Sequence, residues 1–311
     1  MSDGLPLRPV LARLGWAAAV CWVVLTAAFL VVAAVPDTRM VYFTEVEMGF
    51  VAVDTVSGGP VSAYVDWLTA VATLQWGQSV YFETSVRSLY ARRIPVTAVY
   101  VLPGAVAAVL VGTLLTTYAA VEPDGLLARL LSGSGVVGLT VPAFLPAAVL
   151  FATMADTLGW LQVYDPDLGL WHARNLRRLQ VPGAIVGLSL LGVQVRHVRS
   201  ETAERLHETF VKTAEAKGAG RRRVAAHVFR TAWPSAASLV VGESLGVLLL
   251  ATVAVETVLE FPGAGRLVFL GFVAGDPMVS AVALVGIVVV GVAGTLAIEL
   301  LRAVYDPRVD R

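Results

Sequence analysis

Uncharged apolar runs alternate with polar segments along the whole chain. Five runs lack Asp, Glu, Lys and Arg altogether, and a sixth contains only Glu243. A helix needs roughly 20 apolar residues to cross a hydrocarbon core about 30 Å thick. The pattern therefore predicts six membrane-spanning helices, at residues 14–36, 94–121, 130–155, 179–195, 235–255 and 277–298.

Composition supports a membrane protein. Apolar residues make up 57% of the chain and charged residues only 15%, with a mean hydropathy of +0.75. Soluble domains carry nearer to 25% charge, so too few polar residues remain for a water-facing surface. We expect an all-α polytopic membrane protein. The zero net charge gives no indication of nucleic acid, and the single Cys21 implies no disulfide.

The distribution of basic residues predicts the orientation. With the N-terminus inside, cytoplasmic segments hold 15 of the 23 Lys and Arg residues and external segments hold eight. Basic residues favour the cytoplasmic side. We expect the first run to be a retained span of a protein in the cytoplasmic membrane, with both termini cytoplasmic.

The spans divide the chain into four parts. Residues 1–13 form a cytoplasmic N-terminus and residues 14–36 the first span, and residues 37–93 follow as an external loop domain. In that loop, residues 40–56 alternate as a hairpin or edge strand would, and residues 61–74 are typical of a short helix. A loosely packed loop is the alternative. Residues 94–311 form the membrane core, with the other five spans, a charged loop at 200–234 and the C-terminal tail.

The charged loop stands out between the fourth and fifth runs. Residues 196–234 hold nine of the 23 basic residues. Good helix formers fill residues 201–217, where Glu201 and Arg205 are spaced to pair, and Leu206, Phe210 and Ala214 fall on one face as an apolar stripe that a partner could cover.

Glycines predict a turn inside this loop. Gly218 and Gly220 end the first helix at low cost, and Arg221 begins a second helix that Pro234 is expected to close at the membrane. The pattern indicates a helix, a turn and a helix on the cytoplasmic face. The residues alone leave open a solvated loop that only sets the topology.

Catalytic and metal-binding residues are not indicated. The phosphate-binding pattern G-x-x-x-x-G-K-[ST] does not occur, so we do not expect this chain to hydrolyse ATP. A G-x-S-x-G pattern at residues 242–246 lies inside a predicted span, whereas hydrolases need a strand-to-helix elbow there. The four histidines are scattered, without metal-ligand spacing.

Two places are candidates for lining a transport path. Glu243 is an acid deep within a span, where charge is costly and usually faces a cavity or partner. A protonated or hydrogen-bonded packing residue is the alternative. Pro262, Gly263 and Gly265 can form non-helical backbone that dips towards the path, although a surface turn is also possible. Glu256 is a further path candidate at the outer end of its span, where it could be solvated.

The loop resembles the segment that defines permease subunits of binding-protein-dependent ABC importers. That motif is roughly Glu-Ala-Ala, three residues and Gly, and here Gly218 fills the glycine position while Lys212 stands in place of the acid. The closest branch is the dipeptide and oligopeptide permeases, first-subunit type. The residues that carry this resemblance are Thr213 to Gly218, Glu256-Thr257-Val258, Pro262-Gly263-Ala264-Gly265-Arg266, Asp276-Pro277 and Asp306-Pro307-Arg308.

This resemblance implies a type I ABC importer permease fold with six spans. It implies a second, usually unlike permease subunit, two cytoplasmic ATPase subunits that carry ATP and Mg, and an external solute-binding protein. The coupling loop that meets the ATPase would be Lys212, Thr213, Ala214, Glu215, Ala216, Lys217 and Gly218. The chain itself would be non-catalytic, without a cofactor of its own, and would move peptides or similar small solutes.

An ion-gradient-driven secondary transporter is the alternative. That class shows intramembrane ion-binding acids and symmetric halves, for which Glu243 alone is thin support. An intramembrane enzyme is a third class, and no plausible catalytic pair supports it.

Overall fold

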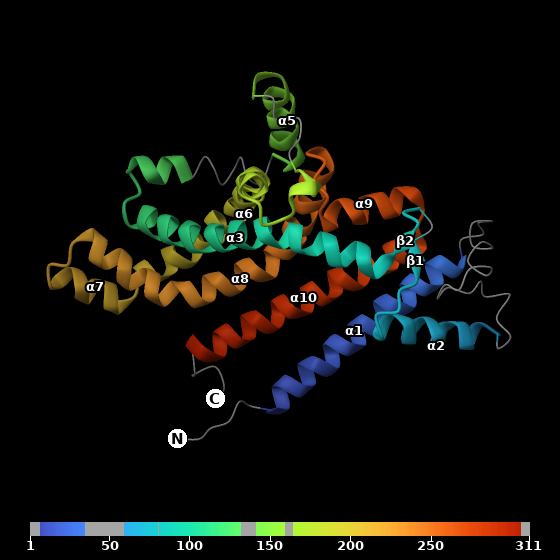
Figure 1. Ribbon diagram of the computed structural model, residues 1–311. Coiled ribbons are helices and arrows are strands. Elements are labelled where there is room, and N and C mark those ends of the chain that lie inside the picture. Colours follow the sequence, from blue (N-terminus) through green and yellow to red (C-terminus); the bar gives the residue numbers. More distant parts are fainter. Residues whose placement is uncertain (1–6, 35–58, 80, 132–140, 159–163, 306–311) are drawn as a thin grey trace. The chain divides into compact units, whose positions relative to one another are not determined.

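The structure is a computed structural model that describes residues 7–34, 59–79, 81–131, 141–158 and 164–305, nearly all of them helical (Figure 1). The elements in chain order are α1 (Leu7–Ala34), α2 (Gly59–Ala72), β1 (Gln78–Ser79), β2 (Thr84–Ser85), α3 (Val86–Val121), α5 (Phe144–Leu158), the 3-10 turn η2 (Pro166–Leu168), α6 (Ala173–Leu206), α7 (Thr209–Ala216), α8 (Arg221–Val258), α9 (Ala264–Ala274) and α10 (Pro277–Tyr305). The helical class predicted from the sequence is confirmed.

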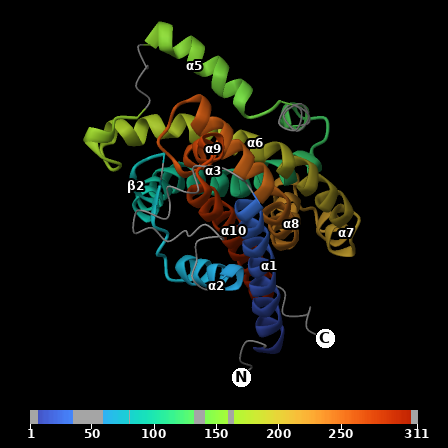
Figure 2. The same ribbon diagram turned by 90° about the vertical axis from the view of Figure 1, so that its right-hand side faces the viewer.

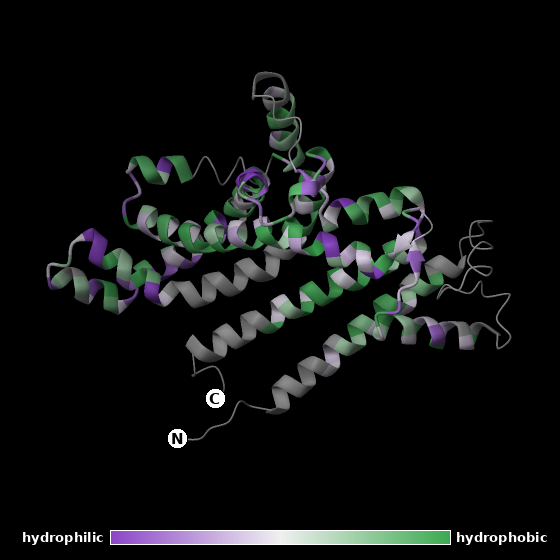
Figure 3. Cartoon of the chain, in the orientation of Figure 1, coloured by the Kyte–Doolittle hydropathy of each residue, from purple (hydrophilic) through white to green (hydrophobic). Residues whose placement is uncertain are grey.

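Helices α3, α6 and α10 contain apolar stretches long enough to cross a membrane. Shorter apolar stretches lie in α1, α5, α8 and α9. Figure 3 shows α3 and the first half of α10 as largely hydrophobic along their length. Residues 132–140 of the run at 130–155 lie outside the described part, and the count of six spans stays a prediction.

The chain divides into two compact units. One contains residues 1–93 and 267–293, and the other contains residues 94–266 and 294–311. Each has its own hydrophobic core, so each is described separately.

Aromatic packing holds the first unit together. Trp67 of α2 is buried against Phe29 of α1, with ring centroids 5.7 Å apart, and Val71, Tyr90 and Val279 belong to the same core. The helix expected at residues 61–74 is confirmed as α2. The hairpin or edge strand expected at residues 40–56 lies outside the described residues.

Asp276 ties three segments of the first unit. Its buried carboxylate accepts hydrogen bonds from Ser79 Oγ at 2.6 Å, from the Tyr81 backbone N–H at 3.3 Å and from the Val279 backbone N–H at 3.0 Å. The last of these caps the N-terminus of α10, and Pro277 at the first helical position costs no hydrogen bond. The Asp276-Pro277 pair is therefore a helix start that also anchors the β1–β2 segment.

Glycines bring α3 and α6 into backbone contact in the second unit. A Cβ on Gly104 would lie 2.7 Å from the Gly183 carbonyl oxygen, and one on Gly187 would lie 3.2 Å from the Gly104 carbonyl oxygen. Small residues allow such approaches between membrane helices. Gly183 and Gly187 of α6 thus pack against Gly104 of α3 without an intervening side chain.

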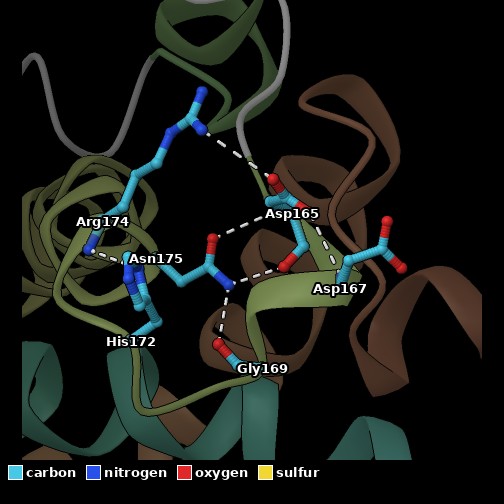
Figure 4. A network of polar contacts seen from close by, with 6 residues as sticks. All are labelled: Asp165, Asp167, Gly169, His172, Arg174 and Asn175. Atoms are coloured by element: carbon cyan, nitrogen blue, oxygen red, sulfur yellow. Dashed lines mark hydrogen bonds and ion pairs between the residues drawn. The ribbon is translucent and has the colours of Figure 1, made fainter.

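The segment before α6 is fixed by a buried asparagine (Figure 4). Asn175 accepts a hydrogen bond from the Asp165 backbone N–H at 3.0 Å and donates to the Asp165 and Gly169 carbonyl oxygens at 2.7 and 2.8 Å. His172 Nδ1 caps α6 by accepting from the Arg174 backbone N–H at 3.3 Å. Asn175 thus makes a rigid turn out of residues 165–172.

Candidate functional site

The predicted coupling loop lies at the tip of a hairpin formed by α6 and α8, with α7 between them (Figures 1 and 2). Helix α6 runs without a break from Ala173 to Leu206, so its apolar and charged halves are one rod. The expected helix over residues 201–217 is wrong in its bounds. The helix is interrupted by a turn at His207 and Glu208, and α7 begins at Thr209. The predicted pair is confirmed, with Arg205 Nη2 at 2.7 Å from Glu201 Oε1.

Gly218 ends α7. Its φ is +75°, and the Ala219 backbone N–H donates to the Ala214 carbonyl oxygen at 3.0 Å. This bond across the turn is the pattern of a Schellman cap, in which the residue with positive φ is usually glycine. A Cβ there would meet no atom within 4 Å. The backbone conformation, and not space, therefore requires glycine at this position.

An apolar cluster fixes α7 on α8. Val211 of α7 is buried against Val224 and Val228 of α8, and Leu206 and Phe210 pack partly on them. The expected stripe of Leu206, Phe210 and Ala214 is only half-buried, with Leu206 and Phe210 lying on the chain's own core, so it is not a free surface for a partner. Val211 was missed, although it and Phe210 are the two large apolar residues of the short helix α7.

The opposite face of α7 is polar and open. Lys212, Thr213, Ala216, Lys217 and Gly218 are all exposed, and Figure 3 shows the hydrophilic colour of the loop around them. The side chain of Glu215 lies outside the described part. The structure thus presents most of the predicted coupling residues to solvent on a packed base.

A second segment joins this base. Glu122, just after α3, accepts from Arg221 Nη1 at 2.7 Å, although Arg221 is largely exposed. Val121 packs partly on the valine cluster. The end of α3 and the start of α8 therefore meet beside α7.

Helix α8 continues through Pro234, so the predicted end at that residue is wrong. It spans 38 residues, about 57 Å at 1.5 Å per residue. Proline is tolerated inside membrane helices where neighbours satisfy the freed carbonyl. Glu243 lies in the middle of this rod, and its side chain is outside the described part.

Glu256, near the other end of α8, is wholly buried. Its Oε1 accepts hydrogen bonds from Thr97 Oγ1 at 2.6 Å and from Tyr100 Oη at 2.7 Å, both on α3, and its Oε2 accepts from the Arg266 backbone N–H at 2.9 Å. Thr97 Oγ1 also accepts from the Ala264 backbone N–H at 2.8 Å. The possible solvation of Glu256 is therefore wrong, since its oxygens are used by α3 and by the start of α9.

Two glycines make room for this carboxylate. A Cβ on Gly263 would overlap the Glu256 carboxyl group, and one on Gly265 would lie 2.9 Å from Val253 Cα and 3.1 Å from Glu256 Oε2. Pro262 is half-buried beside them. We call Thr97, Tyr100, Glu256, Gly263 and Gly265 the Glu256 clasp. Between the predicted spans 235–255 and 277–298 the chain is mostly helical, because α8 runs to Val258 and α9 begins at Ala264.

The structure thus brings three predicted path residues, Glu256, Gly263 and Gly265, into one contact, far along α8 from the predicted coupling residues. Thr97 and Tyr100 were missed. Nothing in the spacing of an uncharged run marks a threonine or tyrosine as the partner of an acid some 160 positions away.

Comparison with known proteins defines the class. Residues 108–311 match the family of binding-protein-dependent transport system inner membrane components. This match covers more than half of the chain, and the protein belongs to that family.

Individual relatives are similar across most of their length. The chain is 29% identical over 252 residues to a putative peptide transport system permease protein of Brucella abortus, covering 78% of each. It is 28% identical over 252 residues to the oligopeptide transport system permease protein OppB of Salmonella typhimurium, covering 79% of each. The permease AppB of Bacillus subtilis is 24% identical over 255 residues, again covering 79% of each chain.

Proposed function

We propose that this chain is the membrane-spanning permease subunit of an ABC importer that moves peptides or similar small solutes. The family match carries the proposal, and the similarity to the peptide and oligopeptide permeases OppB, AppB and the Brucella relative supports the solute class. Membership in this family does not favour the alternative function of an ion-gradient-driven secondary transporter.

The proposed partners follow from the same family. They are a second permease, two cytoplasmic ATPase subunits that bind ATP and Mg, and an external solute-binding protein. ATP hydrolysis takes place on the ATPase subunits, and this chain is non-catalytic. Both termini and α7 lie on the cytoplasmic side.

Residues 212–218 are the proposed contact with the ATPase. The exposed face of Lys212, Thr213, Ala216 and Lys217, on which three of the four side chains are polar, supports this role, because a buried valine cluster beneath it fixes α7 to α8. If the ATPase has different affinities for two conformations of the permease, its binding to α7 shifts the equilibrium between those conformations by the difference in binding free energy.

Helix α8 is the proposed link to the transport path. It begins at Arg221, beside α7, and ends two residues after Glu256. A continuous helix transmits displacement along its axis, so movement at the coupling loop reaches the clasp without a flexible joint. We propose that Glu243 lines the path, and that Glu256 with Pro262, Gly263 and Gly265 shapes one end of it.

Reconstitution tests the proposal. The chain is purified with its companion permease and ATPases in lipid nanodiscs, and ATP hydrolysis is measured with the binding protein and a peptide mixture. We expect peptide-dependent stimulation of ATP hydrolysis in the complex. The proposal would be contradicted by a rate of ATP hydrolysis that does not change with peptide and binding protein, together with uptake driven by an ion gradient in the absence of ATP.

A further inference from the structure

The turn before α6 is held in shape by its own contacts. Asn175 is wholly buried, and its three hydrogen bonds to Asp165 and Gly169 fix the turn to the first residues of α6 (Figure 4). Gly169 has a φ of +74° and a ψ of 164°, a conformation that is essentially restricted to glycine. A surface that is already ordered loses less conformational entropy when a partner binds to it.

This turn exposes two large apolar side chains. Trp171 is 76% exposed and Leu168 is 38% exposed. Exposed charged residues flank them in sequence, namely Asp167 and Arg174, which also pairs with Asp165 across 3.8 Å. We call Asp167, Leu168, Trp171 and Arg174 the Trp171 surface. An apolar centre with a tryptophan and a polar rim is typical of protein interfaces.

The length of α6 separates this surface from the lipid. With its apolar run in the hydrocarbon, α6 begins six residues before that run, from Ala173 to Leu179, which is about 9 Å at 1.5 Å per residue. A headgroup layer is about 5–7 Å thick on each side of the hydrocarbon core. Three arginines lie within those six residues. Trp171, before the helix begins, therefore lies beyond the headgroups and not in the aromatic belt of a membrane.

The other end of α6 indicates the side of the membrane. The helix has 34 residues, about 51 Å at 1.5 Å per residue, so a rod that crosses a core about 30 Å thick has its ends on opposite sides. The proposed function places α7, after the last residue of α6, in the cytoplasm. The Trp171 surface then faces the outside of the cell, where a binding-protein-dependent transporter meets its binding protein.

The inner side of the turn packs near the Glu256 clasp. Tyr164 and Leu170 pack on the hydrophobic core that contains the buried Phe261, and the ring centroids of Tyr164 and Phe261 are 6.3 Å apart. The Phe261 ring also lies 6.4 Å from that of Tyr100, whose hydroxyl group donates to Glu256 Oε1. All of these residues belong to the second unit. A partner seated on the turn therefore rests on the same core as the clasp.

We propose that the Trp171 surface is the docking site of the external solute-binding protein. The inference rests on the proposed function, because that function supplies the partner. The matching surface on the binding protein is an apolar pocket for Trp171 and Leu168, with polar groups at its edge that pair with Asp167 and Arg174.

The affinity of the purified companion binding protein for the assembled permease complex tests the site. Affinity is measured by biolayer interferometry, with the peptide-loaded binding protein and with the complex in nanodiscs or in detergent micelles. We expect Trp171→Ala to weaken binding about thirtyfold, as the loss of a tryptophan at an interface centre does. Gly169→Ala is expected to weaken binding about fivefold, because alanine strains the backbone of the turn, although its Cβ would meet no atom within 4 Å.

Trp16→Ala is the matched control, because Trp16 is a similarly exposed tryptophan, at 73%, within the first predicted span. We expect this variant to bind with wild-type affinity. If the wild type bound and Trp171→Ala bound equally tightly, the docking site would be overturned while the proposed function stood. A loss in nanodiscs that is absent in micelles would assign Trp171 to the membrane surface and would also overturn the docking site. If the wild type did not bind at all, the proposed function would fail together with it.

Discussion

Gly263 lies directly against the carboxyl group of Glu256, so closely that no side chain fits between them. The contact joins the last turn of α8 to the start of α9, and Thr97 and Tyr100 hold the same carboxylate from α3. Within the second unit, α3, the end of α8 and residues 263–266 therefore meet at one buried acid.

Gly263→Ala is expected to destabilise the permease. A Cβ would overlap the Glu256 carboxyl group, and overpacking of this kind costs about 1–3 kcal/mol. The measurement is the thermal unfolding midpoint of the purified complex. Gly246→Ala on α8 is the control, because a Cβ there meets nothing within 4 Å. Equal losses for the two variants would show that the Gly263 contact is not tight.

Glu256→Ala is expected to destabilise more than Glu256→Gln. Alanine leaves Thr97, Tyr100 and the Arg266 backbone N–H without their acceptor, at about 1–3 kcal/mol for each buried donor, whereas glutamine keeps one acceptor oxygen. The unfolding midpoints rank the two variants, with Glu260→Gln, an exposed acid of the same loop, as the control. If Glu256→Gln were the less stable variant, the hydrogen bonds would not explain why this acid is buried.

Gly218→Ala is expected to weaken ATPase binding. Alanine in the left-handed conformation costs about 1–2 kcal/mol, which corresponds to an affinity loss of about five- to thirtyfold if the cap must hold in the complex. Affinity for the ATPase is measured with the permease in nanodiscs. Gly220→Ala provides the control within the same turn, because Gly220 has a negative φ of −64° and open space around its Cα. If the ATPase bound the Gly218→Ala variant with wild-type affinity, the helix cap at Gly218 would not be needed for coupling.

Glu243→Gln is expected to alter peptide uptake while the complex still assembles. The reason is that an acid deep in a membrane span is costly unless it faces water, substrate or a partner. Uptake of a panel of acidic, neutral and basic peptides is compared with wild type, at equal amounts of assembled complex. Identical uptake across the panel would take Glu243 out of the path.

Periodicity and charge predicted much of this molecule. Uncharged runs located the main helices, and Gly218 marked the end of α7. Sequence alone could not show that α6 continues into the charged loop or that α8 passes through Pro234, because a polar composition and a proline both suggest a helix end when tertiary packing is unknown.

The candidate sites were predicted unequally. Local motifs indicated residues 212–218 as the coupling loop, because their polarity and the glycine at position 218 can be recognised from the sequence alone. The sequence indicated only part of the Glu256 clasp. Glu256 and the glycines form a recognisable pattern, whereas Thr97 and Tyr100 lie on another helix. The approach of that helix depends on backbone contact such as that of Gly104 with Gly183. Side-chain burial follows from such packing, and so the expected solvation of Glu256 failed.

The side of the membrane on which residue 215 lies decides whether α7 can reach a cytoplasmic ATPase. With the only native cysteine replaced by Cys21→Ser, Glu215→Cys is labelled with a membrane-impermeant thiol reagent in intact cells and again after permeabilisation. We expect no labelling in intact cells and full labelling afterwards, because the proposed function places α7 in the cytoplasm, in contact with the ATPase. Full labelling in intact cells would contradict it, since a loop outside the cell cannot touch that partner.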